Sequence, residues 1–256
     1  MRSGRNMLRL LIGAGIILFG VIKFCSSAEE NPYTGETQYV DLSAEEEMAL
    51  GAQSTPVMLN EYGGLHRDEA AQTLVRQIGQ KLVQSSVAAS APYDFKFFLL
   101  SDESTVNAFA LPGGPVFITY GLFARLQTED QLAGVLAHEI GHVIGRHSAQ
   151  QMAKQGFTNT LLTGVAVGSE SHGATQAAAV MANLVNMKYG RGDELESDYL
   201  GVKIMRDAGY DPEALIGVME ILAEASGPNR VPEFQSTHPN PENRIEKIKE
   251  AIEATR

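Results

Sequence analysis

Two histidines and a glutamate share one short segment, and their spacing is that of a metal site. The segment His138-Glu139-Ile140-Gly141-His142 follows the pattern H-E-x-x-H within a region of helical periodicity. Residues four apart lie about one turn apart on a helix, so both imidazoles can bind one Zn²⁺. Glu139 is angled toward a water on the metal rather than toward the metal itself. The pattern predicts one catalytic zinc ion per chain, with Glu139 as its general base.

A catalytic zinc needs a third protein ligand and an open position for water. In the helix expected at 192–208, Glu194 and Asp198 are four residues apart and share a face. We therefore expect Glu194 to be the third ligand. Asp198, one turn further on, is expected to accept the free imidazole N–H of a ligand histidine. Glu196 points about 200° away from this face and is expected to be a solvated acid.

A third histidine, His147, follows the motif closely without fitting a ligand position. If the motif helix continues to about Met152, His147 lies about 160° around it from the His138 and His142 edge. The metzincin pattern would need a histidine one residue later, where the chain has Ser148. We expect His147 to be a surface or helix-capping residue.

Composition narrows the class of protein. The chain has 256 residues, 44% hydrophobic and 20% charged, which fits one globular domain and excludes a disordered or polytopic membrane protein. Beyond residue 24 it carries 31 acids against 16 bases, a net charge of −15, so nucleic acid is not an expected partner. The single cysteine, Cys25, adjoins the N-terminal apolar run, so any metal must be held by histidines and carboxylates.

The first 27 residues have the pattern of an export signal. Residues 1–9 are basic, Leu10–Ile22 is uninterruptedly apolar, and small residues at 26–28 suit signal peptidase. The apolar stretch can also cross a thin bilayer if the flanking basic side chains extend to the headgroups. Lipidation of Cys25 is a third possibility. We expect an exported protein, with a cleaved signal, an uncleaved anchor and a lipoprotein as open alternatives.

Apolar periodicity and capping residues predict a mainly helical α+β chain with a small β-sheet. Helices are expected from Ser43, over 71–85, from Thr128 to about Met152, and at 192–208, 212–225 and 241–254; strands are expected at 94–100, 107–110 and 116–120. The last two strands flank Pro112-Gly113-Gly114-Pro115 and should form a hairpin. Residues 155–187 are rich in Ala, Gly and Thr, so they predict packed core helices, with a mobile helical hairpin or lid as the alternative.

Four motifs together resemble a known family. Asn107-Ala-Phe-Ala-Leu-Pro-Gly-Gly, His-Glu-Ile-Gly-His at 138–142, Glu194-Leu-Glu-Ser-Asp198 and Thr237-His238-Pro239 occur in that order. In order and spacing they resemble the zinc endopeptidases of the HtpX-like and CAAX prenyl protease family. The similarity runs from about Asn31 to the C-terminus and is closest to a bacterial periplasmic branch that handles damaged envelope proteins. Unlike CAAX proteases, the chain has one hydrophobic N-terminal segment, which argues against prenylated substrates and intramembrane cleavage.

The resemblance implies a zincin-type fold of the gluzincin group, with roles for particular residues. His138, His142 and Glu194 would be zinc ligands, Glu139 the base, and Asp198 the support of a ligand. The strand that contains Asn107 and Ala108 would edge the cleft and pair with an extended substrate, a mode that tolerates many sequences. His238 lies in a motif of the family and would reach the cleft, either as an oxyanion donor or as a cap on the zinc in a self-inhibited state.

Together these features predict a zinc-dependent endopeptidase that acts on unfolded or misassembled cell-envelope proteins. Residues 1–27 would be the signal peptide or membrane anchor, 28–40 a tether, and 41–256 the zinc metallopeptidase domain. The protein would lie in the bacterial periplasm or be anchored to the membrane facing it. A chaperone-like assembly factor with a vestigial zinc site and an exopeptidase are the alternatives. The intact Glu139 argues against the first, because a structural zinc site needs no base.

Overall fold

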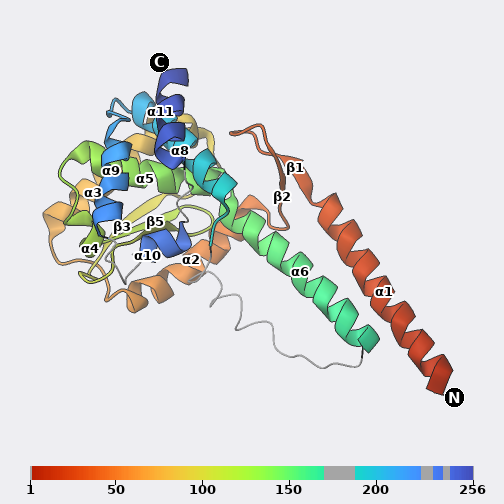
Figure 1. Ribbon diagram of the computed structural model, residues 1–256. Coiled ribbons are helices and arrows are strands. Elements are labelled where there is room, and N and C mark those ends of the chain that lie inside the picture. The colour runs from red at the N-terminus through yellow and green to blue at the C-terminus, as the bar shows by residue number, and fades with distance from the viewer. Residues whose placement is uncertain (1, 170–187, 226–232, 239–242, 256) are drawn as a thin grey trace. The chain divides into compact units, whose positions relative to one another are not determined.

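The chain divides into a larger and a smaller unit. The computed structural model describes residues 2–169, 188–225, 233–238 and 243–255. The larger unit holds Ala44–Ser148 and the chain from Asn186 onward, whereas the smaller holds Met1–Ser43 and the chain from Ala149 to Val185. All the predicted metal ligands lie in the larger unit. Mainly helical architecture with small sheets agrees with the predicted fold class (Figure 1).

A three-stranded sheet lies within the larger unit. Its strands are β3 (Lys96–Leu100), β4 (Ala108–Ala110) and β5 (Pro115–Thr119). The order is β3-β5-β4, with β3 parallel and β4 antiparallel to β5. Every residue of the central β5 is buried, as expected for an apolar strand with neighbours on both sides. The predicted hairpin is confirmed, and it leaves β4 at one edge of the sheet.

Helices of the larger unit surround this sheet (Figure 1). They are α2 (Ala44–Glu61), α3 (Glu69–Gln84), α4 (Tyr120–Phe123), α5 (Glu129–Ile144), α8 (Arg191–Asp207), α9 (Ala214–Glu224), α10 (Glu233–Thr237) and α11 (Arg244–Ala254), with a 3₁₀ turn at Val87–Ser90. Helix α3 packs on β3, and α5 packs on β4, α3, α8 and α9. The helices expected near these positions are confirmed, apart from the C-terminal end of the motif helix.

Helix α5 carries the H-E-x-x-H segment through the core. Thr128 caps its N-terminus by accepting the Gln131 N–H at 3.2 Å, and all residues from Leu132 to Ile144 are buried. Helix α8 approaches closely because a Cβ on Gly141 would lie 2.9 Å from the Ser197 carbonyl oxygen. Glycine inside the motif thus lets α8 bring its carboxylates to the histidines.

The motif helix ends eight residues before the position that periodicity predicted. Gly145 is its C-cap, Arg146 has φ 57°, and α6 (His147–Ser169) begins at the next residue. A positive φ reverses the chain direction, so helical phase is not carried from α5 into α6. The prediction of one helix to Met152 is wrong for this reason.

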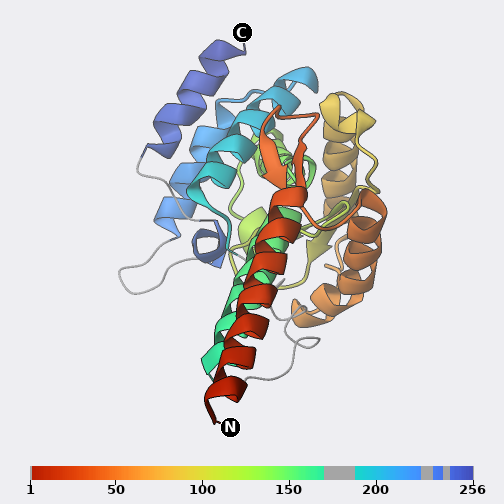
Figure 2. The same cartoon turned by 90° about the vertical axis from the view of Figure 1, so that its right-hand side faces the viewer.

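In the smaller unit, helix α1 (Arg2–Ser26) packs antiparallel to α6 (Figures 1 and 2). The Phe24 ring stacks on both Phe157 and Tyr39, each at 4.6 Å. Strands β1 (Ala28–Glu30) and β2 (Thr37–Tyr39) form an antiparallel pair inside the segment expected to be a tether. The span Asn6–Ser26 is long and apolar enough to cross a membrane. Of the stretch 155–187, the part after Ser169 lies outside the described residues.

Candidate active site

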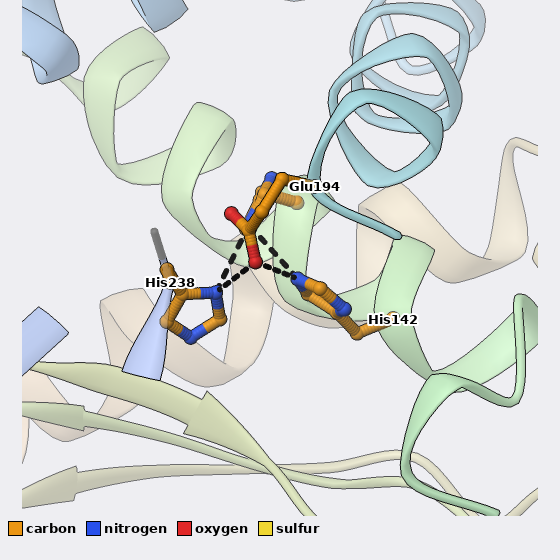
Figure 3. A group of neighbouring side chains, drawn as sticks. His142, Glu194 and His238 are labelled. Atoms are coloured by element: carbon orange, nitrogen blue, oxygen red, sulfur yellow. Dashed lines mark hydrogen bonds and ion pairs between the residues drawn. The ribbon is translucent and has the colours of Figure 1, made fainter. Parts of the chain in front are cut away.

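Helices α5 and α8 bring the three predicted metal ligands together. His138 and His142 direct their Nε2 atoms toward each other at 3.1 Å, and Glu194 places its carboxylate oxygens 3.5 and 3.4 Å from those two nitrogens. All three side chains are buried. Figure 3 shows the Glu194 carboxylate between His142 and a further imidazole, that of His238. The helical spacing of the sequence therefore places these side chains at one point.

The distances between the donor atoms suit a tetrahedral ion. His238 Nδ1 lies 3.4 Å from His138 Nε2 and 3.0 Å from the Glu194 Oε1 atom, so the four side chains can each offer one ligand atom. Zinc bonds of about 2.0–2.1 Å in a tetrahedron separate neighbouring ligand atoms by about 3.3 Å. The buried Glu194 Oε2 lies 3.2 Å from the Arg244 Nη1 atom, so the carboxylate is held as an anion beside the two histidines. Three imidazoles and one carboxylate fit zinc.

A buried ion pair supports His138, and its arginine, Arg244, also lies 3.2 Å from Glu194 Oε2 in the donor cluster. The His138 Nδ1 atom lies 2.9 Å from Asp198 Oδ1, and Arg244 contacts both Asp198 oxygens at 2.7 and 2.9 Å. Although burial opposes charge on the ring, its contacts with Asp198 and Glu194 raise the pKa of His138 to about 9. Burial likewise opposes ionisation of Asp198, yet Arg244 holds the pKa of that carboxyl below its usual value. Asp198 thus remains an anion that can accept the His138 Nδ1–H.

His142 has a different set of neighbours. Its Nδ1 atom lies 2.8 Å from Nδ1 of His147, and its ring stacks on Tyr189 at 3.9 Å. The Tyr189 hydroxyl lies 3.0 Å from the hydroxyl of Ser148. Burial holds the pKa of His142 well below its usual value, which favours the neutral ring that a metal requires.

Glu139 faces the donor cluster without being part of it. Its side chain is fully buried, and neither carboxylate oxygen has a hydrogen-bond partner among the described residues. The His238 Nε2 atom lies 3.7 Å from Glu139 Oε1. Burial raises the pKa of the Glu139 carboxyl. A carboxylate in this state is poised to accept a proton and to give it up again.

His238 reaches the cluster from a short helix, α10. The buried ring stacks on Phe234 at 4.3 Å, and the Phe234 N–H donates to the Val106 carbonyl at 3.2 Å, directly before β4. At the other end of α10, Glu233 accepts from Asn107 Nδ2 at 3.0 Å and from the Tyr62 hydroxyl at 2.5 Å. Hydrogen bonds from Phe234 and Glu233 therefore hold helix α10 at the start of β4, while His238 lies at the donor cluster.

Strand β4 presents one side of its backbone away from the sheet. The Thr119 N–H donates to the Asn107 carbonyl at 3.0 Å, and the Leu111 N–H donates to the Pro115 carbonyl at 2.8 Å. Since antiparallel strands alternate in the direction of their bonds, the backbone groups of Ala108 point to the other edge. Asn107 itself uses its backbone on β5 and its side chain on Glu233. Ala108 has the orientation that pairing with an extended peptide requires.

A known protein family matches most of the larger unit. Residues 69–252 match the model of peptidase family M48, a stretch that includes the motif helix, Glu194 and His238. The chain belongs to peptidase family M48. Its predicted assignment to the zinc peptidases is therefore confirmed at the level of the family.

Known members of the M48 family cover nearly the whole chain. The chain is 32% identical over 251 residues to the β-barrel assembly-enhancing protease of Escherichia coli K12, covering 94% of this chain and 51% of that protein. It is 29% identical over 243 residues to the mitochondrial metalloendopeptidase OMA1 of Schizosaccharomyces pombe, covering 94% and 69%. The chain spans about half the length of its bacterial relatives. These relatives point within the family to a branch other than the HtpX-like and CAAX prenyl proteases.

Three residues that contact the site were not recognised as such from the sequence. His147 is wholly buried against His142, so its predicted place on the surface is wrong; the phase reset after Gly145 explains the error. Glu196 is not simply a solvated acid, because it contacts His147 at 2.6 Å and its side chain is 23% exposed. Arg244 had no sequence signal, since it reaches Asp198 from a helix 46 residues further along the chain.

Proposed function

We propose that this chain is a zinc-dependent endopeptidase that hydrolyses unfolded or misassembled cell-envelope proteins. The observation that carries the proposal is Glu139, a buried carboxylate directed at a donor cluster of three imidazoles and one carboxylate. A purely structural zinc site needs no such base. Membership of family M48 supports the same reaction class and disfavours a chaperone with a vestigial site.

The residues of the chain divide the chemistry among them. His138, His142 and Glu194 would hold zinc, which when bound lowers the pKa of a water molecule and polarises the scissile carbonyl. Glu139 accepts a proton from the attacking water and passes it to the leaving amine nitrogen. Its raised pKa, caused by burial, suits both transfers. Asp198 keeps the His138 ring in the tautomer whose Nε2 is free to bind the metal.

The substrate proposal rests on strand β4. Because the Ala108 backbone points to the sheet edge that no strand of the described residues pairs with, an extended peptide can add there as a further strand. Such pairing uses main-chain groups and accepts many sequences, as a protease for unfolded proteins requires. The name of the E. coli relative, which refers to β-barrel assembly, favours substrates of the outer membrane.

We further propose that His238 caps the metal in a resting state. His238 Nδ1 lies beside Glu194, so the four side chains together would fill the four positions of a tetrahedral zinc and would leave none for water. Helix α10 also covers the start of β4 through Phe234 and Glu233. Displacement of α10 would free the fourth position and the strand edge together. This geometry favours the cap over the oxyanion-donor alternative.

The smaller unit favours an N-terminal segment that is retained as an anchor facing the periplasm. Cleavage near residue 28 would remove Phe24, which lies between Tyr39 and Phe157, and Lys23, which pairs with Asp41 at 2.9 Å. A Cβ on Gly164 would lie 2.6 Å from Ile17, so α1 and α6 approach closely through glycine, as membrane helices do. The mass of the protein purified from its membrane fraction distinguishes this from a cleaved signal or a lipoprotein.

Hydrolysis of denatured casein tests the proposed activity. Purified protein with zinc is expected to cut casein at internal positions, metal-stripped protein to be inactive, and reloading with zinc to restore the activity. Mass spectrometry of the products identifies the cleavage positions. Release of single terminal residues instead would favour the exopeptidase alternative, and zinc-independent hydrolysis would contradict the proposal.

A further inference from the structure

The corner between α5 and α6 is built in a way that places His147 over His142. Gly145 leaves space for the His147 ring, because a Cβ at residue 145 would lie 2.6 Å from the His147 Nε2 atom. Arg146 has φ 57°, an unfavourable conformation for a residue with a Cβ. The buried carboxylate of Glu47 binds the Arg146 guanidinium, with contacts of 2.7 and 2.6 Å. Three features of the chain therefore converge on the position of one buried imidazole.

Hydrogen bonds lead from a carboxylate near the surface to the metal ligand. Glu196 Oε2 lies 2.6 Å from His147 Nε2, and His147 Nδ1 lies 2.8 Å from His142 Nδ1. An ionised carboxylate can only accept, so Glu196 requires the proton of His147 on Nε2. In a ring that carries its one proton on Nε2, Nδ1 is an acceptor, and the 2.8 Å contact then requires the proton of His142 on Nδ1. The Ser197 hydroxyl, 3.2 Å from His147 Nδ1, can donate to the same acceptor.

This order of protons leaves the lone pair of His142 on Nε2. That atom is the one that faces His138 and Glu194. We propose that Glu196 and His147 are positioning residues, which fix the tautomer and the ring orientation of His142 for the metal. The inference rests on the proposed zinc site, but it assigns to two side chains a role that the reaction itself does not require.

Zinc release into excess chelator tests the relay. Glu196→Ala removes the last acceptor and is expected to raise the zinc release rate about 10-fold, because partners of metal ligands typically change affinity by 10- to 100-fold. His147→Phe keeps the ring shape without an acceptor and is expected to release zinc at least as fast. His147→Gln, which can accept from His142 and donate to Glu196, should lie between His147→Phe and the wild type. Asp207→Ala removes an exposed acid from the same helix and serves as the control.

Melting temperatures of the metal-free proteins separate positioning from a structural role. The metal-free Glu196→Ala variant is expected to melt within about 2 °C of the metal-free wild type, since its carboxylate is partly exposed. Wild-type release rates in both Glu196→Ala and His147→Phe would overturn the relay. A fall in metal-free stability that accounts for the faster release would also overturn it. Wild-type protein that binds no zinc would instead contradict the proposed function.

Discussion

His138 and His142 lie one turn apart on the same helix, yet different chemistry supports each ring. Behind His138 is a buried ion pair, Asp198 with Arg244, whose members come from α8 and α11. Behind His142 is an imidazole, His147, from the turn after α5. The first support is charged and fully enclosed, whereas the second ends at a carboxylate that is partly exposed.

The two supports are expected to differ in their main effect: the Asp198–Arg244 pair stabilises the fold, whereas His147 orients a residue of the proposed metal site. The Asp198–Arg244 pair connects three helices, so its loss would leave a buried charge and weaken the whole larger unit. The support of His142 is less extensive, because His147 lies five positions from His142 in the chain and reaches α8 through Ser197 and the partly exposed Glu196 rather than through a buried ion pair. Changes behind His138 should therefore affect stability and metal together, and changes behind His142 should affect the metal alone.

Asp198→Ala should have the largest effect. The change removes the carboxylate that the buried Arg244 contacts twice and leaves it with Glu194 at 3.2 Å, so we expect the free energy of unfolding to fall by about 3 kcal/mol. Urea unfolding of the metal-free proteins measures it, with Asp207→Ala as the control. A loss below about 1 kcal/mol would mean that the two supports do not differ in the way described.

Glu194→Ala should remove the metal with a smaller effect on folding. It deletes the carboxylate that faces both ligand nitrogens, so zinc content after dialysis should drop to less than about a tenth of an ion per chain. Glu196→Ala, two residues away, should still fill with zinc when the ion is in excess. If Glu196→Ala empties the site and Glu194→Ala does not, the ligand assignment is wrong.

His238→Ala separates the three ligands on long helices from the fourth group on α10. Zinc content should stay the same, because His138, His142 and Glu194 remain. Casein hydrolysis should be equal to or faster than that of the wild type if His238 caps the metal. A loss of about 100-fold in kcat with zinc in place would identify His238 as an oxyanion donor instead.

Gly145→Ala should have the smallest effect. It should disturb only His147, the residue that supports His142. The added methyl group would crowd His147 Nε2 and tilt that ring. We expect zinc release to rise about 3-fold, at the lower limit of effects on partners of a metal ligand. The pair Asp198–Arg244 is not in contact with Gly145, so unfolding in urea should change by less than about 1 kcal/mol. A wild-type release rate would show that the fit of His147 is not needed.

Helical periodicity explains how much of the site the sequence could predict. Within α5 and α8 the backbone repeats regularly, so His138, His142, Glu194 and Asp198 could be assigned to common faces from spacing alone. His147 could not, because the chain between it and His142 passes through Gly145 and the positive φ of Arg146. The glycine was visible in the sequence, yet its meaning as a helix end depended on the next residue adopting a left-handed conformation.

Contacts between segments that are distant in the chain could not be predicted from the sequence. Arg244 begins α11 and reaches Asp198 only because α11 packs on α8. Glu233 meets Asn107 across 126 residues of chain, and no local pattern encodes that pairing. The strands and the hairpin were predictable because alternation and the Pro-Gly-Gly-Pro turn are local signals.

Glu139→Gln is the sharpest test of Glu139 as the general base. The amide keeps the shape of the side chain but cannot take a proton from water, while the three proposed zinc ligands remain intact. We expect casein hydrolysis to fall below the detection limit while zinc content and melting temperature match those of the wild type. More than roughly a tenth of wild-type activity in this variant, with its zinc bound, would contradict the assignment of Glu139 as the base.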